Sequence, residues 1–184
     1  MRVPGNLTPC FLLEKLSNYF CVLSLLQLFA YPEQHFFSKE NYIADNKLEY
    51  VIVTHGDSDH IEGFAGTNKE PGIFASYKVD NVIDSISSKT TATYNSYKTA
   101  RDNSGANHYL ASDCFDEKNG AKRVYNLTDN ISMEILWNYY YWNTDTSDEN
   151  NNSVITRFKY NDHYFLLTGD LEGNGEKKFT EYYS

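Results

Sequence analysis

The chain of 184 residues is long enough for one domain with a sizeable hydrophobic core. Its composition, 41% apolar and 16% aromatic, excludes an intrinsically disordered chain. The formal net charge of −9 argues against a dedicated nucleic-acid-binding surface, because phosphate contacts need lysine and arginine, although acidic metal ligands would account for part of that charge.

Residues 1–40 are expected to form an atypical N-terminal segment. Its apolar run, Tyr19 to Ala30, is too short to cross a bilayer as a helix. The run is either a buried helix, which the helical spacing of its leucines favours, or the core of a secretory signal, for which the basic region is poor. We therefore expect a cytoplasmic protein with no membrane span, secreted only if residues 1–30 act as a signal.

The next stretch, residues 48–64, reads LEYVIVTHGDSDHIEGF. Its β-branched start, Tyr50 to Val53, predicts a buried strand, and Ile61 to Ala65 begins a short helix. Four side chains of metal-ligand type lie between them, within six residues: His55, Asp57, Asp59 and His60. Side chains packed this tightly would repel one another or remain unsatisfied without a cation, so the spacing predicts a metal-binding loop. The alternative is a polar turn that contains histidines by chance.

The middle of the chain carries weaker patterns. Gly72 to Tyr77 is typical of a short strand, and Asn81 to Arg101 of two surface helices joined at Ser87 to Thr91. Asp102 to Lys122, rich in Asn, Asp, Gly and Ser, is predicted to be a loop. Three cysteines, Cys10, Cys21 and Cys114, form no zinc-binding spacing and no complete disulfide framework, so we expect ordinary buried or partly buried thiols.

Four strand patterns follow in pairs: Lys122 to Leu127, Ile131 to Trp137, Ser153 to Tyr160 and Tyr164 to Thr168. The turn Asn161-Asp162 joins the second pair. Tyr139 to Asn152 is predicted to be a polar rim loop, whose tyrosines either face a substrate or pack as ordinary surface residues. Gly173 to Tyr183 is predicted to be a closing helix.

The last strand leads to Gly169-Asp170, a pair that turns also favour. Together with the earlier loop it makes Asp170 a candidate metal ligand. Glu172 and Glu176 are expected to be solvated residues at a helix start, where the helix dipole favours negative charge. The remaining histidines, His35, His108 and His163, are expected in loops or on the surface.

The segment THGDSDHIEGF resembles the H-x-H-x-D-H signature of the metallo-β-lactamase fold, with Asp57 in place of the second histidine. This variant is similar to the hydrolase domain of the DNA-uptake competence protein ComEC. A second block supports the same subgroup: Trp137 at a strand end, then Asn151-Asn152-Ser153, then YFLLTGDLEGNGE. The two blocks cover about residues 42–182.

The resemblance implies an α/β (α+β) fold, an αββα sandwich, formed in part by residues 41–184. The opening strands of that fold and the last histidine, which follows the Gly-Asp block in the subgroup, are not found in this sequence. Where the fold usually supplies another histidine, this chain has Trp137-Asn138, as the subgroup also tends to have. We therefore expect a domain truncated at both ends.

The resemblance also implies two divalent metal ions. His55 and Asp57 would bind one, Asp59 and His60 the other, and Asp170 would bridge them. So many carboxylates shift the preference from zinc towards manganese, although zinc remains possible. Two such ions suit phosphodiester hydrolysis, with Asp59 as the catalytic residue that orients the water.

The sequence therefore predicts a metal-dependent hydrolase that acts on a small-molecule or single-stranded nucleic-acid phosphodiester, without a stable nucleic-acid complex. One alternative is an inactive, truncated relative or binding module. Another is a hydrolase of the same fold that acts on a lactam, thioester or lactone. The oligomeric state is left open.

Overall fold

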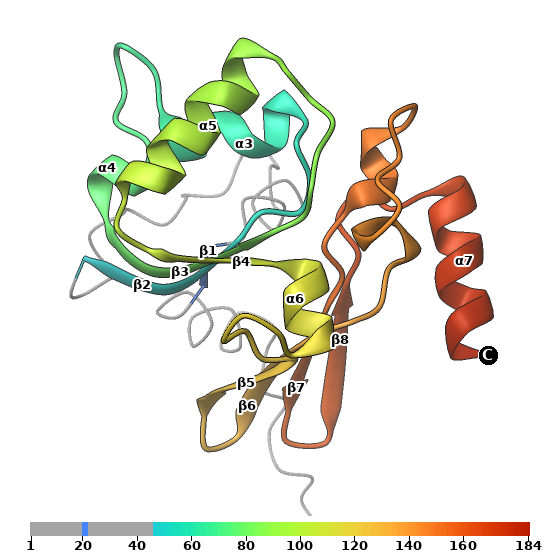
Figure 1. Ribbon diagram of the computed structural model, residues 1–184. Coiled ribbons are helices and arrows are strands. Elements are labelled where there is room, and N and C mark those ends of the chain that lie inside the picture. Colours follow the sequence, from blue (N-terminus) through green and yellow to red (C-terminus); the bar gives the residue numbers. More distant parts are fainter. Residues whose placement is uncertain (1–19, 22–45) are drawn as a thin grey trace, which may run out of the picture.

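The computed structural model describes residues 20–21 and 46–184 (Figure 1). Predictions for the N-terminal segment and for Cys10 and His35 lie outside the described residues. The described part contains two four-stranded sheets and five α-helices, consistent with the expected α+β class. Among these helices none has the length and apolar character needed to cross a membrane.

The first sheet is parallel and has the order β1-β2-β3-β4. Its strands are β1 (Phe20–Cys21), β2 (Lys47–Ile52), β3 (Lys78–Asp84) and β4 (Asn107–Leu110). Val51, Ile52 and Val53 are each at most 2% exposed, because both faces of this sheet are covered. The predicted buried strand before the histidines is therefore confirmed.

Three helices cover one face of the parallel sheet: α3 (Ser58–Ala65), α4 (Ile73–Ser76) and α5 (Ala92–Asn103) (Figure 1). Phe64 of α3 and Tyr97 of α5 pack with Val51 and Val82 in one buried cluster. Thr91 caps the N-terminus of α5, because its hydroxyl accepts a hydrogen bond from the Tyr94 amide at 3.2 Å.

The second sheet is antiparallel and has the order β5-β6-β7-β8. Its strands are β5 (Val124–Thr128), β6 (Ile131–Ile135), β7 (Thr156–Tyr160) and β8 (His163–Leu167), so both predicted hairpins are confirmed. Strand β6 alternates: Met133 is fully buried, whereas Glu134 faces outward and pairs with Arg123 and Arg157. Such alternation is expected for an antiparallel sheet that has one face on the core and the other face in solvent.

The two sheets pack face to face. Ile52 and Ile83 of the parallel sheet share a buried cluster with Met133 and Phe158 of the antiparallel sheet. Helix α6 (Ala111–Asp116) closes this core with Ala111 and the free thiol of Cys114, which is buried as expected. Helix α7 (Gly173–Tyr183), which matches its predicted bounds, packs through Phe179 beyond the second sheet. The layers are thus helices, sheet and sheet, with α7 beside the second sheet (Figure 1).

Three predictions for the middle of the chain are wrong. Gly72 to Tyr77 contains helix α4 instead of a strand: the Gly72 carbonyl accepts hydrogen bonds from two amides of that helix. Residues 81–84 belong to strand β3, not to a surface helix, and residues 102–122 contain β4 and α6 rather than only loop. Short apolar runs do not distinguish strand from helix, and burial on both faces removes the alternation that identifies a strand.

The predicted rim loop is also more ordered than expected. It contains two 3-10 helices, η2 (Tyr139–Tyr141) and η3 (Glu149–Asn152). Tyr141 is 2% exposed and its hydroxyl accepts a hydrogen bond from the Ile155 amide, so it is a core residue. The polar sequence of η3 predicted exposed residues, but Asn151 and Asn152 are buried and hydrogen-bonded.

Candidate metal centre

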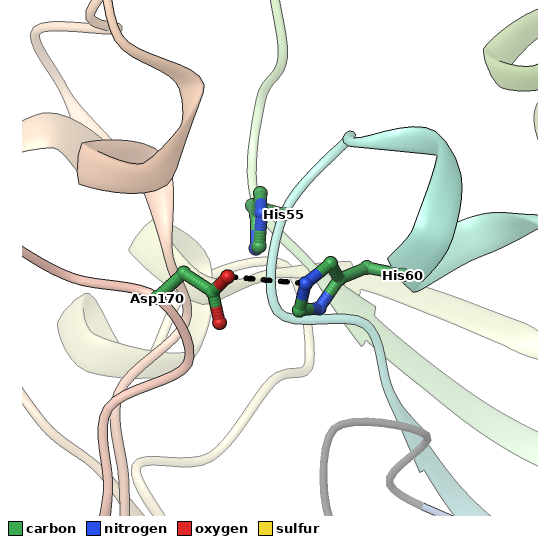
Figure 2. A group of neighbouring side chains, drawn as sticks. All are labelled: His55, His60 and Asp170. Atoms are coloured by element: carbon green, nitrogen blue, oxygen red, sulfur yellow. Dashed lines mark ion pairs between the residues drawn. The ribbon is translucent and has the colours of Figure 1, made fainter. Parts of the chain in front are cut away.

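Two histidines and an aspartate from distant parts of the chain meet where the two sheets adjoin. His55 follows the end of β2, His60 lies in the first turn of α3, and Asp170 follows β8. One ligand atom from each lies within 4.8 Å of the others. Figure 2 shows the three side chains pointing toward one another, and the dashed line joins His60 Nε2 and Asp170 Oδ2, which are 3.2 Å apart. The sequence-predicted loop and Gly-Asp block are thus brought together.

The two sheets are tied to each other at this point. The Val154 amide donates to the carbonyl of Thr54 at 2.8 Å, and the Asp170 amide donates to Ser153 Oγ at 3.2 Å. Gly169 has φ of +58°, and a Cβ there would lie 2.8 Å from Ser153 Oγ. A larger residue at position 169 would therefore be strained and would displace the neighbouring Asp170.

The Thr54 hydroxyl lies beside both imidazoles. Its Oγ1 is 3.1 Å from His55 Nδ1 and 3.4 Å from His60 Nδ1. A hydroxyl oxygen has two lone pairs, so it can accept a hydrogen bond from each Nδ1–H. In that tautomer both Nε2 lone pairs are available to a cation, which is the arrangement that metal-binding histidines use.

His55 Nε2 is buried and has no hydrogen-bond partner among the described residues. Asp57 Oδ2 lies 3.6 Å away, and Asp59 Oδ2 lies 3.7 Å from His60 Nε2. Both separations are longer than a good hydrogen bond and close to about 3.4 Å, the distance between neighbouring ligands of a tetrahedral ion with bonds of about 2.1 Å. The donor types, two imidazoles with carboxylates beside them, therefore fit a divalent cation.

Burial keeps His55 neutral. Desolvation, followed by the neighbouring His60, lowers its pKa from 6.5 to about 4, and the nearby carboxylates oppose this shift. A neutral imidazole is the form that binds a metal ion, so His55 needs no deprotonation at neutral pH.

The two aspartates of the loop are less enclosed. Asp59 has a side chain that is 68% exposed, and Asp57 pairs through Oδ1 with Lys89 Nζ at 2.6 Å. This hydrogen bond raises the pKa of Lys89, so the lysine is a stable cation beside the loop. The structure brings His55, His60 and Asp170 together in one group. Asp57 and Asp59 lie outside that group, and each is next to one of its histidines.

Glu149, a residue that the sequence analysis missed, stabilises the loop that carries His55 and Asp57. It is 6% exposed, and its carboxylate accepts hydrogen bonds from the Gly56 amide at 2.9 Å and from the Asn152 side chain at 3.1 Å. Gly56 lies between His55 and Asp57, so Glu149 fixes the backbone that carries two candidate ligands. The signal in the sequence that could have identified Glu149 is its position just before the Asn151-Asn152-Ser153 block.

The other polar residues considered from sequence have different roles. Asn138 is 1% exposed and uses its amide to hold the carbonyls of Asn151 and Ser153, so it is structural. His163 and His108 are exposed, as expected, and His108 also donates to the buried Asp84 at 2.7 Å. Glu172 and Glu176 are exposed at the start of α7, also as expected.

Comparison with protein-family models, with curated proteins and with solved structures found no match to this chain. Function must therefore be argued from the site.

Proposed function

We propose that this chain is a metal-dependent hydrolase of the metallo-β-lactamase type, similar to the ComEC subgroup, and that it cleaves phosphodiesters. The observation that carries the proposal is the buried His55 Nε2, which has no hydrogen-bond partner in the described part of the chain and lies near His60 and the carboxylates of Asp170 and Asp57. A buried polar atom without a partner is costly, and a bound cation would remove that cost.

Two further features support the proposal. The candidate ligands lie beyond the carboxyl end of β2, the edge where open parallel sheets bind their ligands. Two sheets packed face to face, with helices on the outer face of the first, are part of the arrangement that the sequence resemblance implies.

His55, His60 and Asp170 would hold the cation, joined by Asp57 and Asp59 if two ions bind. A divalent ion there would supply Lewis-acid charge and lower the pKa of a water to near neutrality, as hydrolysis requires. Thr54 orients the two imidazoles, and Ser153 holds the backbone of Asp170. Asp59, the most exposed of the five, is free to accept a proton from a water at the mouth of the site.

The first test is metal binding. Isothermal titration of the EDTA-treated protein with Mn²⁺ and with Zn²⁺ should show binding at micromolar ion or below. His55→Ala and Asp170→Asn should each weaken that binding by at least about tenfold, because each removes one ligand. His163→Ala is the matched control, since His163 is an exposed histidine at the start of β8.

The second test is catalysis. With Mn²⁺, the protein should hydrolyse bis(p-nitrophenyl) phosphate and a single-stranded DNA oligomer, and Asp59→Asn should lower the turnover of both. No metal binding by the wild type would refute the proposal. Hydrolysis of a chromogenic lactam with none of the phosphodiester would assign a different substrate, and metal binding without any hydrolysis would favour a binding module.

A further inference from the structure

Lys89 lies on a loop that is built against the candidate metal site. The loop follows the carboxyl end of β3, and the Lys89 amide donates to Ser87 Oγ at 3.0 Å. Ser87 in turn packs on Gly56, where an added Cβ would lie 2.5 Å from Ser87 Oγ. The close contact between Gly56 and the Ser87 side chain holds the loop of Lys89 against the histidine loop, residues 54–60.

The Lys89 ammonium contacts a candidate ligand directly. Lys89 Nζ is 2.6 Å from Asp57 Oδ1, while Asp57 Oδ2 faces His55 Nε2 at 3.6 Å. The carboxylate of Asp57 thus has one oxygen toward the lysine and one toward the site. Both side chains are about one-third exposed, so their ion pair is weak and can exchange partners readily.

The charges around the site create a problem for an anionic substrate. Asp57, Asp59 and Asp170 surround the histidines, and Glu149 lies directly behind Gly56. These carboxylates attract cations but repel a phosphodiester that approaches the same opening. A lysine at the edge of the cluster opposes that repulsion, and it gives no such advantage to an uncharged lactam or ester.

We propose that Lys89 is a specificity-determining residue that binds the phosphoryl oxygens of an anionic substrate, after a metal ion has replaced it as the partner of Asp57. This inference rests on the proposed function and assigns the site to anionic phosphoryl compounds. Lys89 therefore has two opposed effects. It competes with the metal for Asp57, and it attracts the substrate.

The test uses the full chain with Lys89→Met, which keeps most of the length of the side chain and removes its charge. Mn²⁺ should bind this variant about threefold or more tightly than the wild type, measured by isothermal titration, because a competing cation is gone. Inorganic phosphate should bind the Mn²⁺-loaded variant about tenfold more weakly, because a charged hydrogen-bond donor is gone. The KM for bis(p-nitrophenyl) phosphate should rise by a similar factor with kcat nearly unchanged.

Two controls complete the design. Lys89→Arg should restore phosphate affinity, since it keeps the charge. Lys118→Met should change neither affinity, because Lys118 forms a comparable 2.8 Å pair with Asp116 on an exposed surface after α6.

The opposite signs of the two effects separate this role from a structural one. If Lys89→Met leaves phosphate affinity within twofold of the wild type, or weakens Mn²⁺ and phosphate binding together, the inference is wrong. If the wild type hydrolyses the phosphodiester and the variant behaves in the same way, the proposed function stands and only the role of Lys89 fails. If the wild type binds no metal, both fail.

Discussion

Glu149→Ala should destabilise the protein and weaken metal binding at the same time. The substitution leaves two buried donors, the Gly56 amide and the Asn152 side-chain amide, without the carboxylate that accepts from them. Hydrogen bonds to a charged group contribute about 1.5–3 kcal/mol each, so we expect the free energy of unfolding to fall by about 3 kcal/mol. For a chain of 184 residues this lowers Tm by about 6–12 °C.

The assay is urea unfolding in EDTA, followed by Mn²⁺ titration of the folded variant. Glu149→Gln should lose about half as much stability, because its carbonyl oxygen can still accept from Gly56 while its amide group faces the amide of Asn152. The control is Glu181→Ala on α7, where an exposed 4.0 Å pair with Lys177 is worth at most about 0.5 kcal/mol. Metal affinity should fall about tenfold in Glu149→Ala, since the loop that carries His55 loses its support. A loss of stability below about 1 kcal/mol, or unchanged metal affinity, would refute this account.

Three further predictions follow from the described contacts. Mn²⁺ at 100 times its Kd should stabilise the wild type by about 2.7 kcal/mol, a rise in Tm of about 5–10 °C that calorimetry would detect and that His55→Ala should lack. In EDTA the free energy of unfolding should decrease by up to about 3 kcal/mol as the pH falls from 6.5 to about 4, because His55 binds a proton more readily in the unfolded chain. His55→Gln should remove this part of the pH dependence. An unchanged pH dependence in that variant would contradict a neutral, buried His55. Asp84→Asn should cost about 3 kcal/mol or more in urea unfolding without altering Mn²⁺ affinity, because Asp84 is 3% exposed and accepts hydrogen bonds from Tyr97, Arg101 and His108.

Local chemistry made several elements predictable from sequence. The run Tyr50 to Val53 is β-branched and ends in closely spaced ligand side chains, so both the strand and the polar loop after it could be recognised. The turn Asn161-Asp162 indicated the antiparallel hairpin of β7 and β8, and α7 lies at its predicted bounds. In each case the signal is contained within a few neighbouring residues.

Burial explains the errors in the middle of the chain. Strand β3 lies between helices on one face and the second sheet on the other, so Val82 and Ile83 are both fully buried and no alternation remains to distinguish the strand from a helix. Composition predicted Tyr141 and Asn152 to be rim residues, yet both are core residues because their polar atoms have partners inside the protein.

By itself the sequence determined the types and spacing of the candidate ligands, His55 to His60, and the strands that end at the two blocks, since spacing and turn chemistry are local properties. Only the tertiary structure decided that Asp170 faces His60, that Glu149 supports Gly56 from 93 positions away, and that Lys89 contacts Asp57. These contacts depend on how two sheets pack and on which loops meet at their edges. That packing is a sum of many weak, long-range interactions, and no short stretch of sequence encodes it.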